Sequence, residues 1–139
     1  MKNKTAKSLE LSFDHAALTV ADLERSVEFY ETLGFKVEIR YKGEDGGYDI
    51  VHLKLGENYV ELFSKPGISQ RNVSDAFAGD IDTIGIKHFS LCSNDLEATV
   101  RYLRGNGLEP TSEIMQGKTV SKYVFFRDPD GNWVEIAER

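Results

Sequence analysis

The sequence predicts an α+β fold made of two copies of a βαβββ unit, and three observations carry this prediction. Two similar segments lie at an offset of 73 residues, which places His15 on His88. Within each copy, apolar residues alternate as in a strand, then recur at helical spacing, and then alternate again. Glycine and proline residues fall between these stretches, where the chain has to turn.

The repeat extends over the whole of each unit. With His15 on His88, the segment HAALTVADLERSVEFYETLGFKV lies on HFSLCSNDLEATVRYLRGNGLEP without a gap. Near the end of each copy, YVEL with Glu61 matches WVEI with Glu135 at an offset of 74. Each copy therefore begins with a histidine and ends with a glutamate, and a repeat of this kind fixes the architecture.

The first unit is predicted over residues 12–64. Residues 12–20 alternate and indicate a strand. Asp22 can cap the helix that follows, and Gly34 ends it. The apolar positions of this helix are Leu23, Val27, Tyr30 and Leu33. The remaining strands are expected at residues 35–42, 48–55 and 58–64.

The second unit is predicted over residues 86–138 in the same order. Its elements are a strand at 86–93, a helix at 95–105 and strands at 108–113, 119–127 and 132–138. Residues 65–85 form the linker between the units, with a short helical turn expected near residues 75–78. Residues 1–11 are expected to be a mobile N-terminal tail.

Composition limits the classes of partner. The net charge of −6 disfavours nucleic acid and anionic membranes, because both bind basic surfaces. Cys92 is the only cysteine, so no disulfide can form within the chain. The basic, polar start lacks the apolar stretch of a secretion signal, and we expect a cytoplasmic protein. A homodimer is the expected assembly, since two-fold dimers are the commonest oligomers.

The two glutamates are candidate metal ligands. Glu61 lies between Tyr59 and Phe63 on one strand face, and Glu135 lies beside Trp133. Two carboxylates buried in one aromatic cavity would repel each other, and a divalent cation relieves this. A lone histidine or glutamate of this kind is usually a core or ion-pair residue, but the repetition favours ligands. The predicted ligand set is His15, Glu61, His88 and Glu135.

Further residues are predicted to line the substrate pocket because they share the face of the ligands. They are His52, Tyr59, Phe63, Cys92, Tyr123, Arg127 and Trp133. Each has a simpler alternative. His52 would be an exposed strand residue, the aromatic residues would pack in the core, Cys92 would be a small buried thiol, and Arg127 would cap the last hairpin.

These motifs resemble the glyoxalase I / vicinal-oxygen-chelate superfamily over residues 12–138. The resemblance is carried by DHAALTVADLERSVEFYETLGFKV, YVELF, GIKHFSL and FFRDPDGNWVEIAE. It implies that the two units form a curved, partly open mixed β-sheet around the metal, with the helices outside. One divalent ion per site is implied, and Zn, Ni, Co, Mn and Fe all accept this ligand set.

The four-ligand set is most similar to that of glyoxalase I. This implies a lyase or isomerase that transfers a proton next to a metal-bound carbonyl of a small oxoaldehyde–thiol adduct. Glu135 is the favoured base and Glu61 the alternative. Thr19 and Lys65 replace an arginine and an asparagine of the glutathione-dependent members. The resemblance therefore does not determine whether the thiol of the substrate adduct is glutathione.

Two alternatives to the glyoxalase I reading remain. The first is another metalloenzyme of the superfamily, namely a dioxygenase, an epimerase or a thiol transferase. The second is a non-catalytic protein that binds a drug or metabolite. The sequence also leaves open whether the two units pair within one chain or are swapped between two chains.

Overall fold

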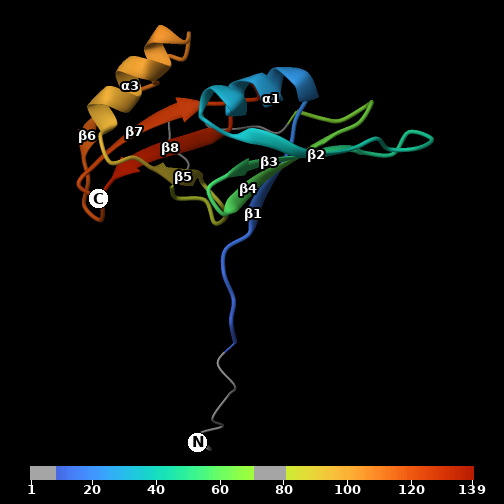
Figure 1. Cartoon of the computed structure of the whole chain (residues 1–139), viewed down its shortest axis with the longest axis horizontal. Helices are drawn as coiled ribbons and strands as arrows, with labels where there is room; N and C mark the ends of the chain where they lie inside the picture. The colour runs from blue at the N-terminus through green and yellow to red at the C-terminus, as the bar shows by residue number, and fades with distance from the viewer. Residues whose placement is uncertain (1–8, 71–80) are drawn as a thin grey trace, which may run out of the picture.

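The computed structural model describes residues 9–70 and 81–139, which form two βαβββ units (Figure 1). The first unit consists of β1 (His15–Thr19), α1 (Leu23–Thr32), β2 (Lys36–Tyr41), β3 (Asp49–Leu55) and β4 (Asn58–Ser64). The second consists of β5 (Phe89–Cys92), α3 (Leu96–Gly105), β6 (Met115–Gln116), β7 (Lys122–Arg127) and β8 (Trp133–Glu138). The helical turn expected near residues 75–78 and most of the expected N-terminal tail lie outside the described residues.

Each unit contains one open, mixed, four-stranded sheet. The strand orders are β1-β4-β3-β2 and β5-β8-β7-β6, so the two sheets have the same topology. The first strand of each unit is parallel to its neighbour, and the other pairs are antiparallel. The predicted α+β fold of two βαβββ repeats is thereby confirmed. His15 begins β1 and His88 directly precedes β5, and both strands lie at an edge of their sheet.

Both helices begin where the sequence predicts, because an aspartate caps each of them. Asp22 accepts a hydrogen bond from the backbone N–H of Arg25, and Asp95 accepts one from that of Ala98. Gly34 follows α1 with φ 101°, a left-handed conformation that glycine adopts without strain. None of the helices in residues 9–70 and 81–139 is long and apolar enough to cross a membrane.

One predicted strand, at residues 108–113, is wrong. The structure instead has the two-residue strand β6 at Met115–Gln116. Pro110 lies in the middle of the expected strand and cannot donate a ladder hydrogen bond. The segment is attached to β7 through Thr111, whose N–H and hydroxyl both donate to the carbonyl oxygen of Phe125 at 2.8 and 3.0 Å.

The helices and the inner faces of the two sheets share one hydrophobic core. The core side chains of β4 are Val60 and Leu62, and those of β8 are Val134 and Ile136. Both helices lie on the upper side of the sheets in Figure 1 and cover this face. Side chains of odd-numbered residues in β4 and β8 point to the other face, because side chains alternate along a strand.

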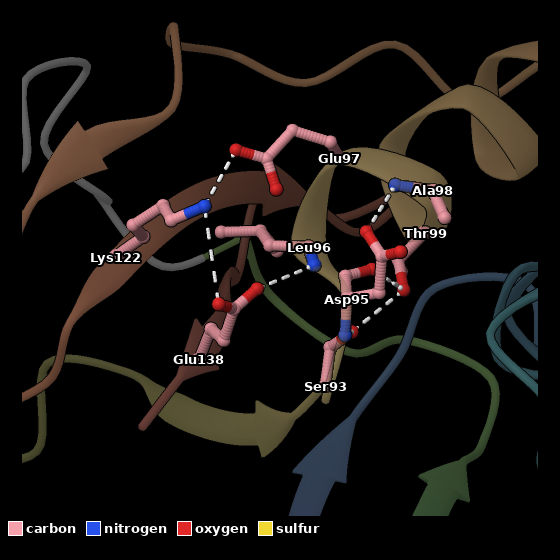
Figure 2. A network of polar contacts seen from close by, with 8 residues as sticks. All are labelled: Ser93, Asp95, Leu96, Glu97, Ala98, Thr99, Lys122 and Glu138. Atoms are coloured by element: carbon pink, nitrogen blue, oxygen red, sulfur yellow. Dashed lines mark hydrogen bonds and ion pairs between the residues drawn. The ribbon is translucent and has the colours of Figure 1, made fainter.

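Polar contacts also fix α3 to the sheet of the second unit (Figure 2). Glu138 at the end of β8 accepts a hydrogen bond from the N–H of Leu96 at 2.8 Å. Lys122 of β7 lies 2.7 Å from Glu97 and 3.8 Å from Glu138. The carboxylate of Glu138 therefore accepts a hydrogen bond from an N–H in the first turn of α3 and pairs with Lys122 of β7. These contacts fix the position of β8, the strand that also carries Glu135.

The two units are joined by a buried hydrogen bond. The Tyr30 hydroxyl on α1 donates to Asp128 Oδ2 at 2.8 Å, and these two residues are 0% and 4% exposed. Burial, and secondarily the charge of Asp128, raises the pKa of Tyr30 far above its ordinary value, so it stays a donor. Asp128 begins the turn between β7 and β8, and Asp130 of the same turn accepts from the N–H of Ala21.

Replacing Tyr30 with phenylalanine is expected to lower the free energy of unfolding by about 1–3 kcal/mol, because a buried carboxylate loses a donor. Urea unfolding measures this change. The control is Tyr102→Phe on α3, where the side chain is 63% exposed and little change is expected. Equal stability of the two variants would show that the contact does not hold the units together.

Candidate metal centre

The first candidate pair is His15 with Glu61. The parallel register of β1 and β4 places Ala17 opposite Glu61, with His15 at the start of β1. His15 Nε2 lies 3.7 Å from Glu61 Oε1. The side chains are 36% and 17% exposed, so the pair lies at the rim of the face opposite the core.

The second candidate pair is His88 with Glu135, and it reproduces the first. His88 directly precedes β5, and Ser90 lies opposite Glu135 of β8. His88 Nε2 lies 3.7 Å from Glu135 Oε2, and the side chains are 26% and 16% exposed. The pairing of each histidine with the glutamate of its own unit therefore follows the sequence repeat.

The donor atoms of each pair fit a shared metal ion. Bonds of a divalent ion to histidine nitrogen and carboxylate oxygen are about 2.0–2.2 Å long, which places two neighbouring ligand atoms about 3–4 Å apart. The separation of 3.7 Å in each pair meets this requirement. Within residues 9–70 and 81–139, no three His, Cys, Asp or Glu side chains form one group that could hold an ion. The structure thus presents two half-sites, and their union around one ion stays a prediction.

Asp14 supports the first half-site, and the sequence reasoning missed it. His15 Nδ1 donates to Asp14 Oδ2 at 2.7 Å, which leaves Nε2 free to act as a ligand toward Glu61. A carboxylate that holds the second ring nitrogen is the usual support of a metal-binding histidine. The only sequence signal was its position directly before His15. The repeat gives no help, because Lys87 occupies the corresponding place.

Of the predicted pocket residues of the first unit, His52 contacts the half-site and Tyr59 packs beside His52. His52 of β3 is opposite Glu61 in the register, and its Nε2 hydrogen-bonds to Glu61 Oε2. The Tyr59 ring lies 5.6 Å from the His52 ring. Phe63 packs edge-on against Tyr48 at 6.0 Å. His52 is therefore a partner of the candidate ligand rather than only an exposed strand residue.

The second half-site is bordered by aromatic rings. Phe125 lies 5.1 Å from the His88 ring and 5.7 Å from both Tyr123 and Trp133. The Arg127 guanidinium stacks over the Trp133 ring at 4.3 Å, a cation–π contact that orients both groups. Sequence reasoning missed Phe125, although it shares the strand face of Tyr123.

Cys92 corrects one expectation. Its side chain is exposed, so the alternative of a small buried thiol is wrong, and its place in a substrate pocket stays a prediction. The reason is the parity of β5: Phe89 and Leu91 face the shared core, and Ser90 and Cys92 face outward.

A cavity of about 500 Å³ lies between the units. Its lining includes Thr19 of β1, Lys87, His88, Asp130 and Trp133. Of the four candidate ligands only His88 lines this cavity. A small molecule held there would lie beside the second half-site.

Comparison with known proteins agrees with the fold. The family model of the Glyoxalase/Bleomycin resistance protein/Dioxygenase superfamily matches residues 12–136. The uncharacterized protein YwkD of Bacillus subtilis is 32% identical over 131 residues, covering 92% of this chain and 97% of that protein. A lactoylglutathione lyase of Pseudomonas aeruginosa is 26% identical over 148 residues, covering 93% and 83%.

Solved structures show the same fold. A glyoxalase family protein from Enterococcus faecalis superposes with a TM-score of 0.77 at 24% identity, covering 91% of this chain and 97% of that one. Glyoxalase I from Zea mays superposes with a TM-score of 0.74 at 26% identity, covering 91% of this chain and 44% of the maize chain. With its two βαβββ units, its two His–Glu pairs and these relatives, the chain belongs to the Glyoxalase/Bleomycin resistance protein/Dioxygenase superfamily.

Proposed function

We propose that the protein is a divalent-metal-dependent lyase or isomerase of the glyoxalase I type, acting on a small oxoaldehyde–thiol adduct. The observation that carries this proposal is the repeated His–Glu pair, 3.7 Å between donor atoms in both units. The similarity to lactoylglutathione lyases supports it, as does a cavity beside His88 that is large enough for a small metabolite.

The proposed residues would hold the ion and move one proton. The ligands are His15, Glu61, His88 and Glu135. A divalent ion at this site would polarise a substrate carbonyl and acidify the neighbouring C–H bond. Glu135 accepts that proton on a carboxylate oxygen and returns it to the adjacent carbon. Tyr123, Phe125 and Trp133 lie on the same sheet as Glu135, and their rings shield its carboxylate from water.

The two half-sites are proposed to meet across a homodimer interface. In the described residues β1 pairs only with β4 and β5 only with β8, so each histidine strand has an open edge. An open edge is a template for another strand. A two-fold dimer that joins β1 of one chain to β5 of its partner would create two equal sites.

Exposed apolar side chains support this interface. Leu9, Leu11 and Phe13 are 80%, 85% and 69% exposed and alternate along the segment that leads into β1 (Figure 1). Ile84 and Ile86, which precede β5, are 102% and 90% exposed. Apolar stripes beside both open edges are surfaces that association would bury.

The proposal is tested by turnover with defined ions and substrates. Protein stripped with a chelator is reloaded with Zn, Ni, Co, Mn or Fe(II) and mixed with adducts of methylglyoxal and glutathione, cysteine or another small thiol. We expect thioester formation with at least one ion, loss on chelation and recovery on reloading. Stoichiometric binding without product would favour a binding protein, and iron-dependent oxygen uptake would favour a dioxygenase.

A further inference from the structure

The two half-sites differ at one position of the sheet. The β3–β4 register places His52 opposite Glu61, whereas the β7–β8 register places Phe125 opposite Glu135. These are equivalent positions of the repeat, since each is the neighbour-strand residue directly across from the glutamate. The approximate symmetry of the candidate centre is therefore broken by one histidine.

The contacts of Glu61 divide its two oxygens between two histidines. Oε2 accepts a hydrogen bond from His52 Nε2, and Oε1 lies 3.7 Å from His15 Nε2. The rings of His15 and His52 are 5.7 Å apart, and they come from β1 and β3, the two strands that flank β4. Oε2 is thus held by His52, and Oε1 remains available to bind an ion together with His15.

The equivalent support cannot exist at Glu135. Phe125 has no hydrogen-bonding atom, and its ring packs instead against His88 and Trp133. Of the two carboxylates, only Glu61 has a side-chain donor opposite it in the sheet. A carboxylate held by a neighbouring donor keeps its orientation, whereas one beside a flat ring can rotate more freely.

We propose that His52 is a positioning residue of the metal centre, which fixes Glu61 as a ligand through Oε1. Glu61 is then the stationary carboxylate, and Glu135 is the one that can leave the ion and carry a proton. This inference rests on the proposed function and assigns different roles to two glutamates that the repeat makes look equivalent. His52 acts through Glu61 and does not itself bind the ion.

The test compares His52→Phe, which installs the residue of the second unit, with His52→Gln, which keeps an N–H donor. The measurement is the Kd for Co²⁺ and Zn²⁺, by competition with a chelating dye. Loss of a supporting hydrogen bond typically weakens metal binding about 10–100-fold, and this is expected for His52→Phe. His52→Gln is expected to stay within about three-fold of the wild type, since the donor is retained.

Two controls separate positioning from a merely structural effect. Lys54→Gln changes a residue on the same strand and the same face, and its Kd is expected to equal that of the wild type. Thermal unfolding of all variants without metal is expected to be similar, so that only metal binding separates them.

Three results would contradict either the role of His52 or the proposed function, and they can be told apart. Equal Kd values for wild type and His52→Phe would refute the role of His52 and leave the proposed function standing. Equal losses in His52→Phe and His52→Gln would show that His52 is itself a ligand. Failure of the wild type to bind Zn, Ni, Co, Mn or Fe(II) would instead remove the proposed function.

Discussion

Turnover by the Glu135→Gln variant is expected to fall by about 10²–10⁴-fold, the usual contribution of a positioned acid–base group. An amide has nearly the shape of the carboxylate but cannot accept and return the proton. Steady-state kinetics of the metal-loaded variant with the adduct that the wild type accepts best would measure this loss. Stability should change little, because Glu135 lies on the face opposite the shared core.

The matched control for this prediction is Glu113→Gln, at an exposed position of the second unit outside the half-site. Its rate is expected to equal that of the wild type. Undiminished turnover in Glu135→Gln would exclude this residue as the base. Retained activity in both Glu135→Gln and Glu61→Gln would exclude the proton-transfer mechanism itself.

Mixing two inactive variants is expected to restore activity if the half-sites meet across a dimer. A mixed dimer of Glu61→Gln and Glu135→Gln chains has one site with both substitutions and one site with neither. Half of the dimers in an equal mixture are mixed, so about one quarter of the wild-type turnover should return. Native mass spectrometry of chains of different mass verifies the exchange.

The same mixture distinguishes the alternative assembly. If each chain holds all four ligands by itself, every site in the mixture carries one substitution. Activity would then stay at the level of the separate variants after complete exchange, and the shared site would be refuted. A further control mixes Glu61→Gln with Glu61→Ala, which should restore nothing in either assembly.

Much of the half-site geometry could be predicted from the sequence because it depends on local patterns. The caps Asp22 and Asp95 fix where the helices begin, and strand parity places Glu61 and Glu135 on the face opposite the core. The repeat then pairs each glutamate with the histidine of its own unit. These features need only spacing and alternation, which a single chain displays.

Other features depended on contacts between distant segments, which spacing does not reveal. The relation between the two half-sites depends on how the units pack, including the Tyr30–Asp128 contact across 98 positions of the sequence. The strand expected at residues 108–113 followed from the repeated order of elements, and Pro110, which cannot donate a ladder hydrogen bond, interrupts it. The contact of His52 with Glu61 required the register of β3 on β4, and parity alone left its role undecided.

The most direct test of the metal centre is elemental analysis of the protein purified without a histidine tag, for the wild type and Glu61→Gln. After loading and removal of excess ion, the wild type should hold close to one divalent ion per chain, as expected for one site per four ligands. The variant should hold clearly less, and Glu113→Gln should match the wild type. Absence of bound ion in the wild type, after loading with Zn, Ni, Co, Mn and Fe(II), would contradict the proposed centre.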